Sequence, residues 1–178
     1  MTQLTTLGGM RNTSFASMHC SLAQSLELIG DWWTPLVLRD LYLGLNRFDQ
    51  FVTDLGISRN LLTDRLTTLV DGGLVRRTPY QQNPVRYSYE LTEAGQELVP
   101  ILIALTAWGD RWATPPAGQP LRFTHTTCGK VTTATVCCSE CGETLEMDDV
   151  RPSPGPGGRT APGTALIESV LSGLKPKA

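Results

Sequence analysis

The sequence predicts a mainly α-helical fold that carries one small β-hairpin. Three consecutive patterns in residues 47–89 support this: a short amphipathic segment that stops at Gly56, a second helical segment, and two β-type runs around a polar turn. Ser58 stands where a helix N-cap is expected, and the Gly72-Gly73 pair stands where that helix would end. The polar turn, residues 81–84, separates runs rich in Val, Tyr and Arg, as in a hairpin.

Helix, tight turn, helix and hairpin, in this order, are typical of a winged helix-turn-helix, whose second helix enters a DNA major groove. On that helix the apolar residues Leu61, Leu62, Leu66, Leu69 and Val70 follow a helical period and can pack inward, which leaves a polar face. Arg and Asn can bond guanine and adenine edges bidentately, and Thr can bond a base or contact a thymine methyl. An amphipathic core helix with a solvated polar face is the alternative interpretation of this segment alone.

We therefore divide the candidate DNA contacts into two groups. The residues expected to read bases are Ser58, Arg59, Asn60 and Thr63. The residues expected to contact phosphates, or the minor groove through the hairpin, are Arg65, Arg76, Arg77 and Arg86.

Length and charge set bounds on these interpretations. The 178 residues are enough for one domain with a small appendage, and the composition, 40% apolar and 18% charged, is that of a soluble globular protein. No apolar stretch approaches the roughly 18 residues that cross a bilayer, and the N-terminus has no secretory pattern, so we expect a cytoplasmic protein without a membrane segment. The net charge of −2 argues against a general nucleic-acid binder, whereas residues 56–89 hold five arginines and two aspartates.

Two helices are expected before the central stretch. Residues 1–16 form a loose leader, and residues 17–30 a first helix with Leu22, Leu26 and Ile29 at helical spacing. Residues 31–44 predict a second helix, with Asp31 or Thr34 placed to cap it and Pro35 in its first turn. This helix is too apolar for the surface, so we expect it at the centre of the core with Trp32, Trp33, Leu36, Val37, Leu41 and Leu43.

A long helix follows the hairpin over residues 92–112, with Thr92 as its N-cap. Its apolar residues lie on more than one face, so it needs a partner beyond its own core. We expect it to form a homodimer interface together with the N-terminal helix; the alternative is a long helix lying across the core of one monomer. A homodimer would place two recognition helices about one DNA turn apart on an inverted repeat. Residues 17–113 make up this winged-helix and dimerisation domain.

The remaining chain divides by composition. Residues 114–120 form a Pro- and Gly-containing linker, residues 121–150 a small Cys-rich β module, and residues 151–178 a Pro/Gly-rich tail that ends in a short amphipathic helix.

The Cys-rich module holds two pairs of metal-ligand residues. His125 and Cys128 are separated by two residues, as are Cys138 and Cys141, and paired soft ligands at this spacing are what tetrahedral zinc requires. The spacer between the pairs is short, and Cys137 beside Cys138 leaves the choice of ligand open. A thiol–disulfide switch between Cys138 and Cys141, or cysteines left from an ancestral site, are the alternatives. If zinc binds, its role is structural, because four protein ligands leave no open position.

The motifs in residues 20–51, 57–77, 85–98 and 105–112 together closely resemble the HxlR family of bacterial transcriptional regulators. The resemblance covers slightly over half of the chain, from Cys20 to Trp112. It implies a winged helix-turn-helix, a homodimer built from N- and C-terminal helices, and binding to palindromic double-stranded DNA operators. Several members sense oxidants or electrophiles through a cysteine that opens the first helix. Cys20 occupies the matching position, which makes it a redox candidate; a buried structural thiol at the dimer contact is the alternative.

No catalytic constellation or phosphate-binding glycine loop is evident, so we expect no enzyme. The leading hypothesis is a sequence-specific, homodimeric DNA-binding regulator, possible effectors being oxidants, electrophiles or a small ligand. The alternative is a metal- or thiol-dependent protein-interaction adaptor on a winged-helix scaffold. The arginines of the hairpin favour DNA, because a protein-binding hairpin has no need of them.

Overall fold

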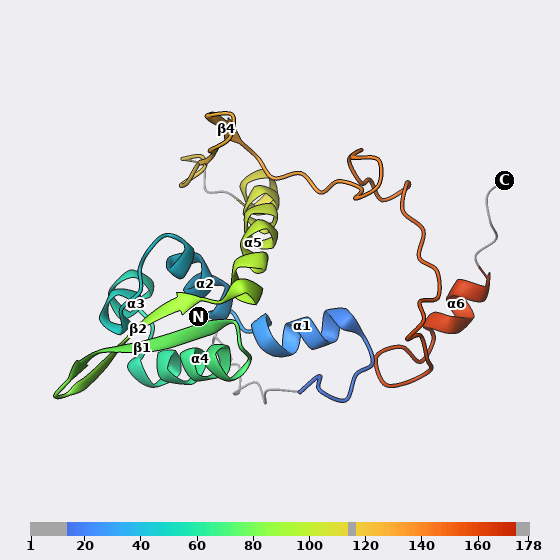
Figure 1. The fold of residues 1–178 in the computed structure, drawn as a ribbon. Coiled ribbons are helices and arrows are strands. Elements are labelled where there is room, and N and C mark those ends of the chain that lie inside the picture. Colours follow the sequence, from blue (N-terminus) through green and yellow to red (C-terminus); the bar gives the residue numbers. More distant parts are fainter. Residues whose placement is uncertain (1–13, 114–116, 174–178) are drawn as a thin grey trace, which may run out of the picture. The chain divides into compact units, whose positions relative to one another are not determined.

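In the computed structural model, the predicted helices and hairpin follow one another in the expected order (Figure 1). The structure describes residues 14–113 and 117–173, so most of the predicted leader, part of the linker and the last five residues lie outside the described residues. The helices are α1 (Ser21–Ile29), α2 (Thr34–Tyr42), α3 (Phe48–Leu55), α4 (Arg59–Asp71), α5 (Glu93–Trp112) and α6 (Ile167–Gly173). The strands are β1 (Val75–Gln82), β2 (Val85–Leu91), β3 (Phe123–His125) and β4 (Lys130–Thr132).

The chain forms two compact units. One comprises residues 31–151, and the other comprises the segments before Asp31 and after Arg151. The domain expected over residues 17–113 therefore crosses the boundary between the units, because α1 is grouped with the tail.

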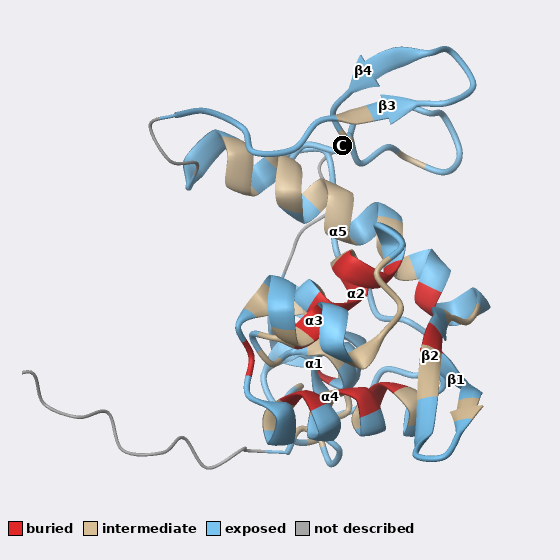
Figure 2. Cartoon of the chain, turned by 90° about the vertical axis from the view of Figure 1, so that its left-hand side faces the viewer, coloured by how far each residue is buried: buried red, intermediate tan, exposed pale blue. Residues whose placement is uncertain are grey.

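The core of the 31–151 unit lies where α2, α3, α4 and the hairpin meet, as the buried positions show (Figure 2). Phe51 of α3 is fully buried, with its ring edge-on to Tyr89 of β2 at 6.2 Å. On α4, three of the predicted inward residues, Leu62, Leu66 and Leu69, are buried, whereas Leu61 and Val70 are half-buried. Each fully buried side chain of this kind contributes about 1.5–3 kcal/mol. The other buried apolar residues of the unit are Val37, Leu38, Leu41, Ile57, Leu74 and Val75.

The start of α2 differs from the prediction. The helix begins at Thr34, and the carboxylate of Asp31 accepts hydrogen bonds from the backbone N–H of Trp33 at 2.8 Å and from the Thr34 hydroxyl. Trp32 lies before the helix and is 83% exposed, so its expected place in the core is wrong. The same holds for two residues on the helix and just after it, Leu36 and Leu43, which are 37% and 49% exposed.

The hairpin pairs β1 and β2 antiparallel from Val75 opposite Leu91 to Gln82 opposite Val85. A short third segment joins it, because the Tyr89 N–H donates to the Asn46 carbonyl at 2.9 Å and Arg47 forms a bridge with Ser88. The loop before α3 is thereby fixed to the hairpin.

Thr92, the predicted cap of α5, connects three elements. Its hydroxyl accepts from the Gly95 N–H at 3.2 Å and donates to the Gly73 carbonyl, just after α4, at 2.6 Å. Its own N–H donates to the Leu74 carbonyl at the start of the hairpin. Gly95 packs against that carbonyl so closely that a Cβ there would lie 2.1 Å from the oxygen. The end of α4, the hairpin and α5 therefore meet at one rigid junction.

In the other unit, α1 buries only Ala23. Leu22 and Leu26, two of the residues predicted at helical spacing, are 67% and 41% exposed. The N-cap of α1 is Cys20, and the tail helix α6 forms near the predicted place. Within the described residues, no helix is long and apolar enough to span a membrane.

Candidate nucleic-acid interface

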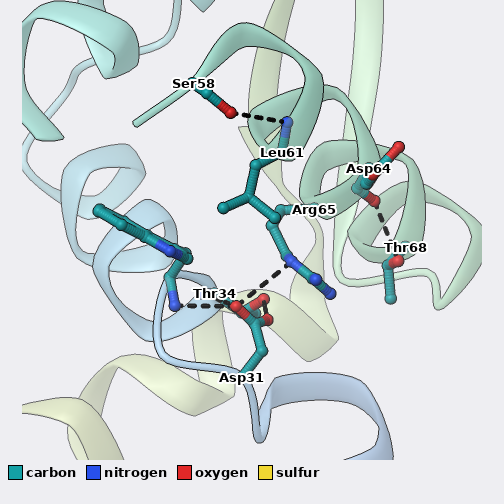
Figure 3. Close-up of polar contacts among 8 residues, drawn as sticks. Asp31, Thr34, Ser58, Leu61, Asp64, Arg65 and Thr68 are labelled. Carbon is teal, nitrogen blue, oxygen red and sulfur yellow. Dashed lines mark hydrogen bonds and ion pairs between the residues drawn. The ribbon is translucent and has the colours of Figure 1, made fainter. Parts of the chain in front are cut away.

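The helix-turn-helix is closed by a left-handed glycine and a serine cap. Gly56 ends α3 with φ of 63°, a conformation that suits glycine because it lacks a Cβ. Ser58 then caps α4 as predicted, and its Oγ accepts from the Leu61 N–H at 3.3 Å (Figure 3). The first turn of α4 is exposed, so Ser58, Arg59 and Asn60 all face solvent while the leucines of the helix are buried.

Arg59 is held in place by α3. Its guanidinium pairs with the Asp49 carboxylate at 2.7 Å and lies 5.5 Å from the centre of the Phe48 ring. Both members of the ion pair are about two-thirds exposed, so water screens the pair and it contributes at most about 1 kcal/mol to folding. Arg59 is thus oriented but readily released to another acceptor. One turn further along, the exposed Thr63 hydroxyl donates to the Arg59 carbonyl at 2.8 Å.

Arg65 does not point outward as predicted. Its side chain is only 20% exposed and turns toward Asp31, with 3.3 Å between Arg65 Nε and Asp31 Oδ1 (Figure 3). Asp31 is itself 20% exposed and is the carboxylate that receives the start of α2. The structure therefore places Arg65 as a link between α4 and α2, and not on the exposed face with the other candidate DNA contacts.

The hairpin carries three exposed arginines, as expected: Arg76, Arg77 and Arg86. Arg76 pairs across the strands with Glu90 at 2.6 Å, and Arg77 lies over the Tyr87 ring at 4.8 Å from its centre. These contacts fix the aliphatic stems along the strands, and each guanidinium keeps donors free for an anionic backbone.

A cluster near the tip of the hairpin was not predicted. Arg47, the N-cap of α3, lies 3.6 Å from the centre of the Tyr80 ring. Hydrogen bonds from Arg47, and to a lesser degree from Arg86, lower the pKa of the exposed Tyr80 hydroxyl. The cluster adds Arg47 and Tyr80 to the candidate DNA contacts. The only sequence signal was an arginine flanking the first helix and an aromatic residue before the polar turn, and neither indicates a contact by itself.

A buried aspartate of α2 forms part of an ion-pair network with α3. Asp40 of α2 is fully buried, and Arg39 reaches both it, at 2.6 Å, and Asp54 of α3, at 2.8 Å. Burial raises the pKa of Asp40, and the bond from Arg39 only partly opposes this. Its Oδ2 atom has no hydrogen-bond partner among the described residues.

Cys20 lies half-buried at the N-terminus of α1. Together with segments of the tail it lines an open cavity of about 900 Å³. The preceding residue fastens the tail there: the His19 ring donates from Nε2 to the Gly157 carbonyl at 2.6 Å, and its backbone N–H donates to the Pro162 carbonyl at 3.0 Å. Cys20 is therefore partly exposed where the segment before α1 contacts residues 157–162 of the tail.

The candidate zinc ligands are brought together two at a time. His125 Nδ1 lies 3.4 Å from Cys128 Sγ. Hydrogen bonding from the Cys141 backbone, and then from the Glu140 backbone and the Cys141 side chain, lowers the pKa of the Cys138 thiol. Among the residues that the structure describes, no three His, Cys, Asp or Glu side chains lie near enough to share one ion.

Comparisons with known proteins identify relatives that share this architecture. The profile of the HxlR-like helix-turn-helix family matches residues 28–117, half of the chain. The uncharacterized HTH-type transcriptional regulator Rv3095 of Mycobacterium tuberculosis is 42% identical over 137 residues, which are 77% of this chain and 87% of that protein. A shorter relative, the uncharacterized HTH-type transcriptional regulator YdeP of Bacillus subtilis, is 32% identical over 52% of this chain and 73% of its own length.

Solved structures agree with the sequence matches. The crystal structure of PA1607 has a TM-score of 0.70 at 32% identity and covers 80% of this chain and 100% of that chain. PA1374 from Pseudomonas aeruginosa has a TM-score of 0.55 at 37% identity, over 79% of this chain and 95% of its own. The redox regulator HypR in its oxidized form has a TM-score of 0.50 at 31% identity, over 54% of this chain and 100% of that chain.

Proposed function

The chain belongs to the HxlR-like helix-turn-helix family of transcriptional regulators, and from this premise we propose that it binds an inverted-repeat DNA operator as a homodimer. The first turn of α4 reads bases in the major groove, and the hairpin contacts the flanking backbone. The observation that carries the proposal is the division of α4 into a buried leucine face and an exposed first turn that presents Arg59 and Asn60.

The side chains of that first turn have the chemistry for base recognition. Arg59 can bond guanine O6 and N7, and Asn60 can bond adenine N6 and N7, each bidentately. Asp49 holds the Arg59 guanidinium in the free protein, so that the side chain is partly ordered before it meets DNA and loses less conformational entropy on binding.

The hairpin supplies charge without sequence information. Arg76, Arg77 and Arg86 are exposed, and Arg47 and Tyr80 lie beside them. Contacts from such residues to phosphates fix the orientation of the protein on the duplex and make binding depend on salt.

The dimer proposal rests on α5. Ile101, Leu105, Trp108 and Trp112 recur every three or four residues, which places them along one side of the helix, and they are 57%, 56%, 60% and 66% exposed. Such an exposed apolar stripe marks an interaction surface. A second copy packed on it by two-fold symmetry would repeat the recognition helix on a second half-site.

Selection of genomic fragments by the purified, reduced protein, followed by footprinting, tests the operator. We expect one or a few sites with an inverted repeat. Arg59→Ala should weaken binding to that site by about 5- to 150-fold, the loss of one bidentate base contact. Arg76→Ala should weaken binding to all sequences alike and reduce the salt dependence by about one ion.

Two outcomes contradict the proposal. If Arg59→Ala leaves the operator preference unchanged, the first turn of α4 is not the reading face. If no fragment is enriched even at low salt, DNA binding itself is refuted, and a protein-interaction adaptor is the function to pursue.

Sedimentation velocity tests the dimer. Trp108→Asp should shift the protein to a monomer, because it places a charge in the centre of the stripe. Met147→Asp is a matched control, since Met147 is also a large exposed apolar residue, at 88%, but lies outside α5. A dimer that survives Trp108→Asp would show that the stripe is not the interface.

Cys20 is the residue through which we propose a redox response. Its support is its partly accessible position at the start of α1, together with the similarity of the chain to a protein named as a redox regulator.

A further inference from the structure

The turns that hold the candidate metal ligands in residues 121–150 repeat each other. His125 and Cys138, Cys128 and Cys141, and Gly129 and Gly142 are each 13 residues apart in the chain. In both turns the glycine has a left-handed backbone, with φ of 69° and 76°. In both, the glycine N–H donates back to the carbonyl of the first ligand, at 2.8 Å to His125 and 2.9 Å to Cys138. Two segments with different sequences thus form the same turn.

The strands that flank the turns repeat as well. In the first hairpin, His125 pairs with Lys130 and Thr124 with Val131. In the second, the Cys138 N–H donates to the Glu143 carbonyl at 2.8 Å, and Cys137 forms a bridge with Thr144. Shifting the first set by 13 residues gives the second, so the segment consists of two equivalent hairpins, each with a ligand pair at its turn.

In the first turn the ligand atoms have the spacing of a metal site. Tetrahedral zinc, with Zn–S of about 2.3 Å and Zn–N of about 2.0–2.1 Å, separates a sulfur from a nitrogen by about 3.6 Å. The distance from His125 Nδ1 to Cys128 Sγ is 3.4 Å. In the second turn, the bond from the Gly142 N–H to the Cys138 carbonyl closes the same turn around Cys138 and Cys141 that the bond from Gly129 to His125 closes around the first pair.

We propose that the two turns are the halves of one structural zinc site, with His125 Nδ1 and the sulfurs of Cys128, Cys138 and Cys141 as its ligands. The described structure forms each pair but does not join three ligands, so the ion draws the two turns together. Binding releases the protons of the three thiols and leaves a site with a net charge of −1, because three thiolates and a neutral imidazole coordinate one Zn²⁺. The four protein ligands fill the coordination shell, so the role is structural.

The repeat also decides between the neighbouring cysteines. Cys137 corresponds to Thr124, the residue before the first ligand, and successive residues on a strand point to opposite faces. Its thiol is directed to the Thr135 carbonyl at 3.9 Å. Cys138 is therefore the ligand, and Cys137 is a matched control that differs by one position.

The segment has a physical need for such a link. None of the residues 121–150, all of which the structure describes, is buried. A segment of this size cannot stabilise itself through a hydrophobic core, and small modules of this kind usually depend on disulfides or metals. The hairpins provide the geometry, and zinc provides the free energy that the missing core does not.

The test uses the full chain purified under reducing conditions without chelator, with zinc and protein quantified and thiols counted by mass spectrometry after alkylation. We expect about one zinc per chain in the wild type and in Cys137→Ser, and less than about a tenth of that in Cys138→Ser and Cys141→Ser. Titration with Co²⁺ should give sulfur-to-cobalt charge-transfer absorption in the wild type and in Cys137→Ser. His125→Ala should bind Co²⁺ at least about tenfold more weakly.

Several outcomes overturn the proposal. One is a wild-type protein with free thiols that neither carries zinc nor shows Co²⁺ charge-transfer bands. Another is a disulfide between Cys138 and Cys141 in freshly purified reduced protein, which indicates a thiol switch. A third is loss of the metal in Cys137→Ser with retention in Cys138→Ser, which reverses the ligand assignment. Because the wild type and Cys137→Ser are read directly, misfolding of the other variants cannot hide a failure.

Discussion

The ion pair between Asp31 and Arg65 should stabilise the fold and not contact DNA, and a double-mutant cycle can measure this. Asp31→Asn keeps an oxygen that can accept from the Trp33 N–H while it removes the charge. Arg65→Met keeps the aliphatic stem that packs along α4 but removes the guanidinium. The double variant completes the cycle and isolates the energy of interaction between the two charges.

The expected magnitude follows from the geometry. Two unit charges 3.3 Å apart attract by about 5 kcal/mol at an effective dielectric constant of about 20. The cost of removing both largely buried groups from water offsets most of this. Arg65 Nε also makes no aligned hydrogen bond, which lowers the estimate further. We therefore expect a coupling energy of about 1–2 kcal/mol, above that of exposed pairs and within the range for residues in contact.

Urea denaturation followed by circular dichroism gives the free energy of unfolding of the four proteins. Arg65→Met should lower it, whereas its operator affinity at a temperature where it is fully folded, and the salt dependence of that affinity, should match the wild type. Arg59→Ala is the comparison, because it should lower the operator affinity and leave the free energy of unfolding nearly unchanged. A coupling energy near zero, together with a reduced salt dependence in Arg65→Met, would refute this role and return Arg65 to the phosphate contacts.

Three further predictions follow from single residues. Gly95→Ala should lower the free energy of unfolding by about 3 kcal/mol in urea titrations, because the new Cβ would lie 2.1 Å from the Leu74 carbonyl; Gly109→Ala on the same helix, where a Cβ meets nothing within 4 Å, should raise it by up to about 1 kcal/mol. Burial raises the pKa of Asp40, so this group stabilises the fold most below its unfolded pKa of about 4, and that contribution is lost as the pH rises through the folded pKa. Asp40→Asn should remove this loss of stability with rising pH. If the free energy of unfolding, measured from about pH 4.5 to about pH 7.5, declines equally in both proteins, the prediction is contradicted. Cys20→Ser should abolish any effect of peroxide or diamide on operator binding in anisotropy assays while leaving the affinity of the reduced protein unchanged, and an oxidant effect that persists in the variant would exclude this thiol.

Local signals in the sequence were sufficient for most of the helix-turn-helix. The cap at Ser58, the stop at Gly56 and the cap at Thr92 each depend on hydrogen bonds within a few residues, so the residue type largely decides the structure. The buried face of α4 was also predicted, because leucines three or four residues apart lie on the same side of a helix.

Contacts between distant segments could not be predicted in this way. Arg65 lies three residues after Leu62 and four before Leu69, at the edge of the buried face of α4. Its side chain turns inward because it pairs with Asp31, a carboxylate 34 positions earlier in the chain. Trp32 is apolar, which predicts a place in the core, but α2 starts two residues later, so the helical period does not apply to it. The cluster of Arg47 and Tyr80 likewise forms only because the loop before α3 pairs with the hairpin.

The hydrogen bonds of Thr92 couple the orientation of α4 to that of α5. The hydroxyl is bonded both to the carbonyl of Gly73, just after α4, and to the Gly95 N–H in the first turn of α5, so neither helix can tilt there without breaking a bond of 2.6 or 3.2 Å. The 20 residues of α5 extend about 30 Å from this point. A rotation of about 5° about the junction moves the far end of such a helix by about 2.6 Å. In the proposed dimer, a small change in the angle at which two α5 helices cross would therefore change the distance between the two recognition helices.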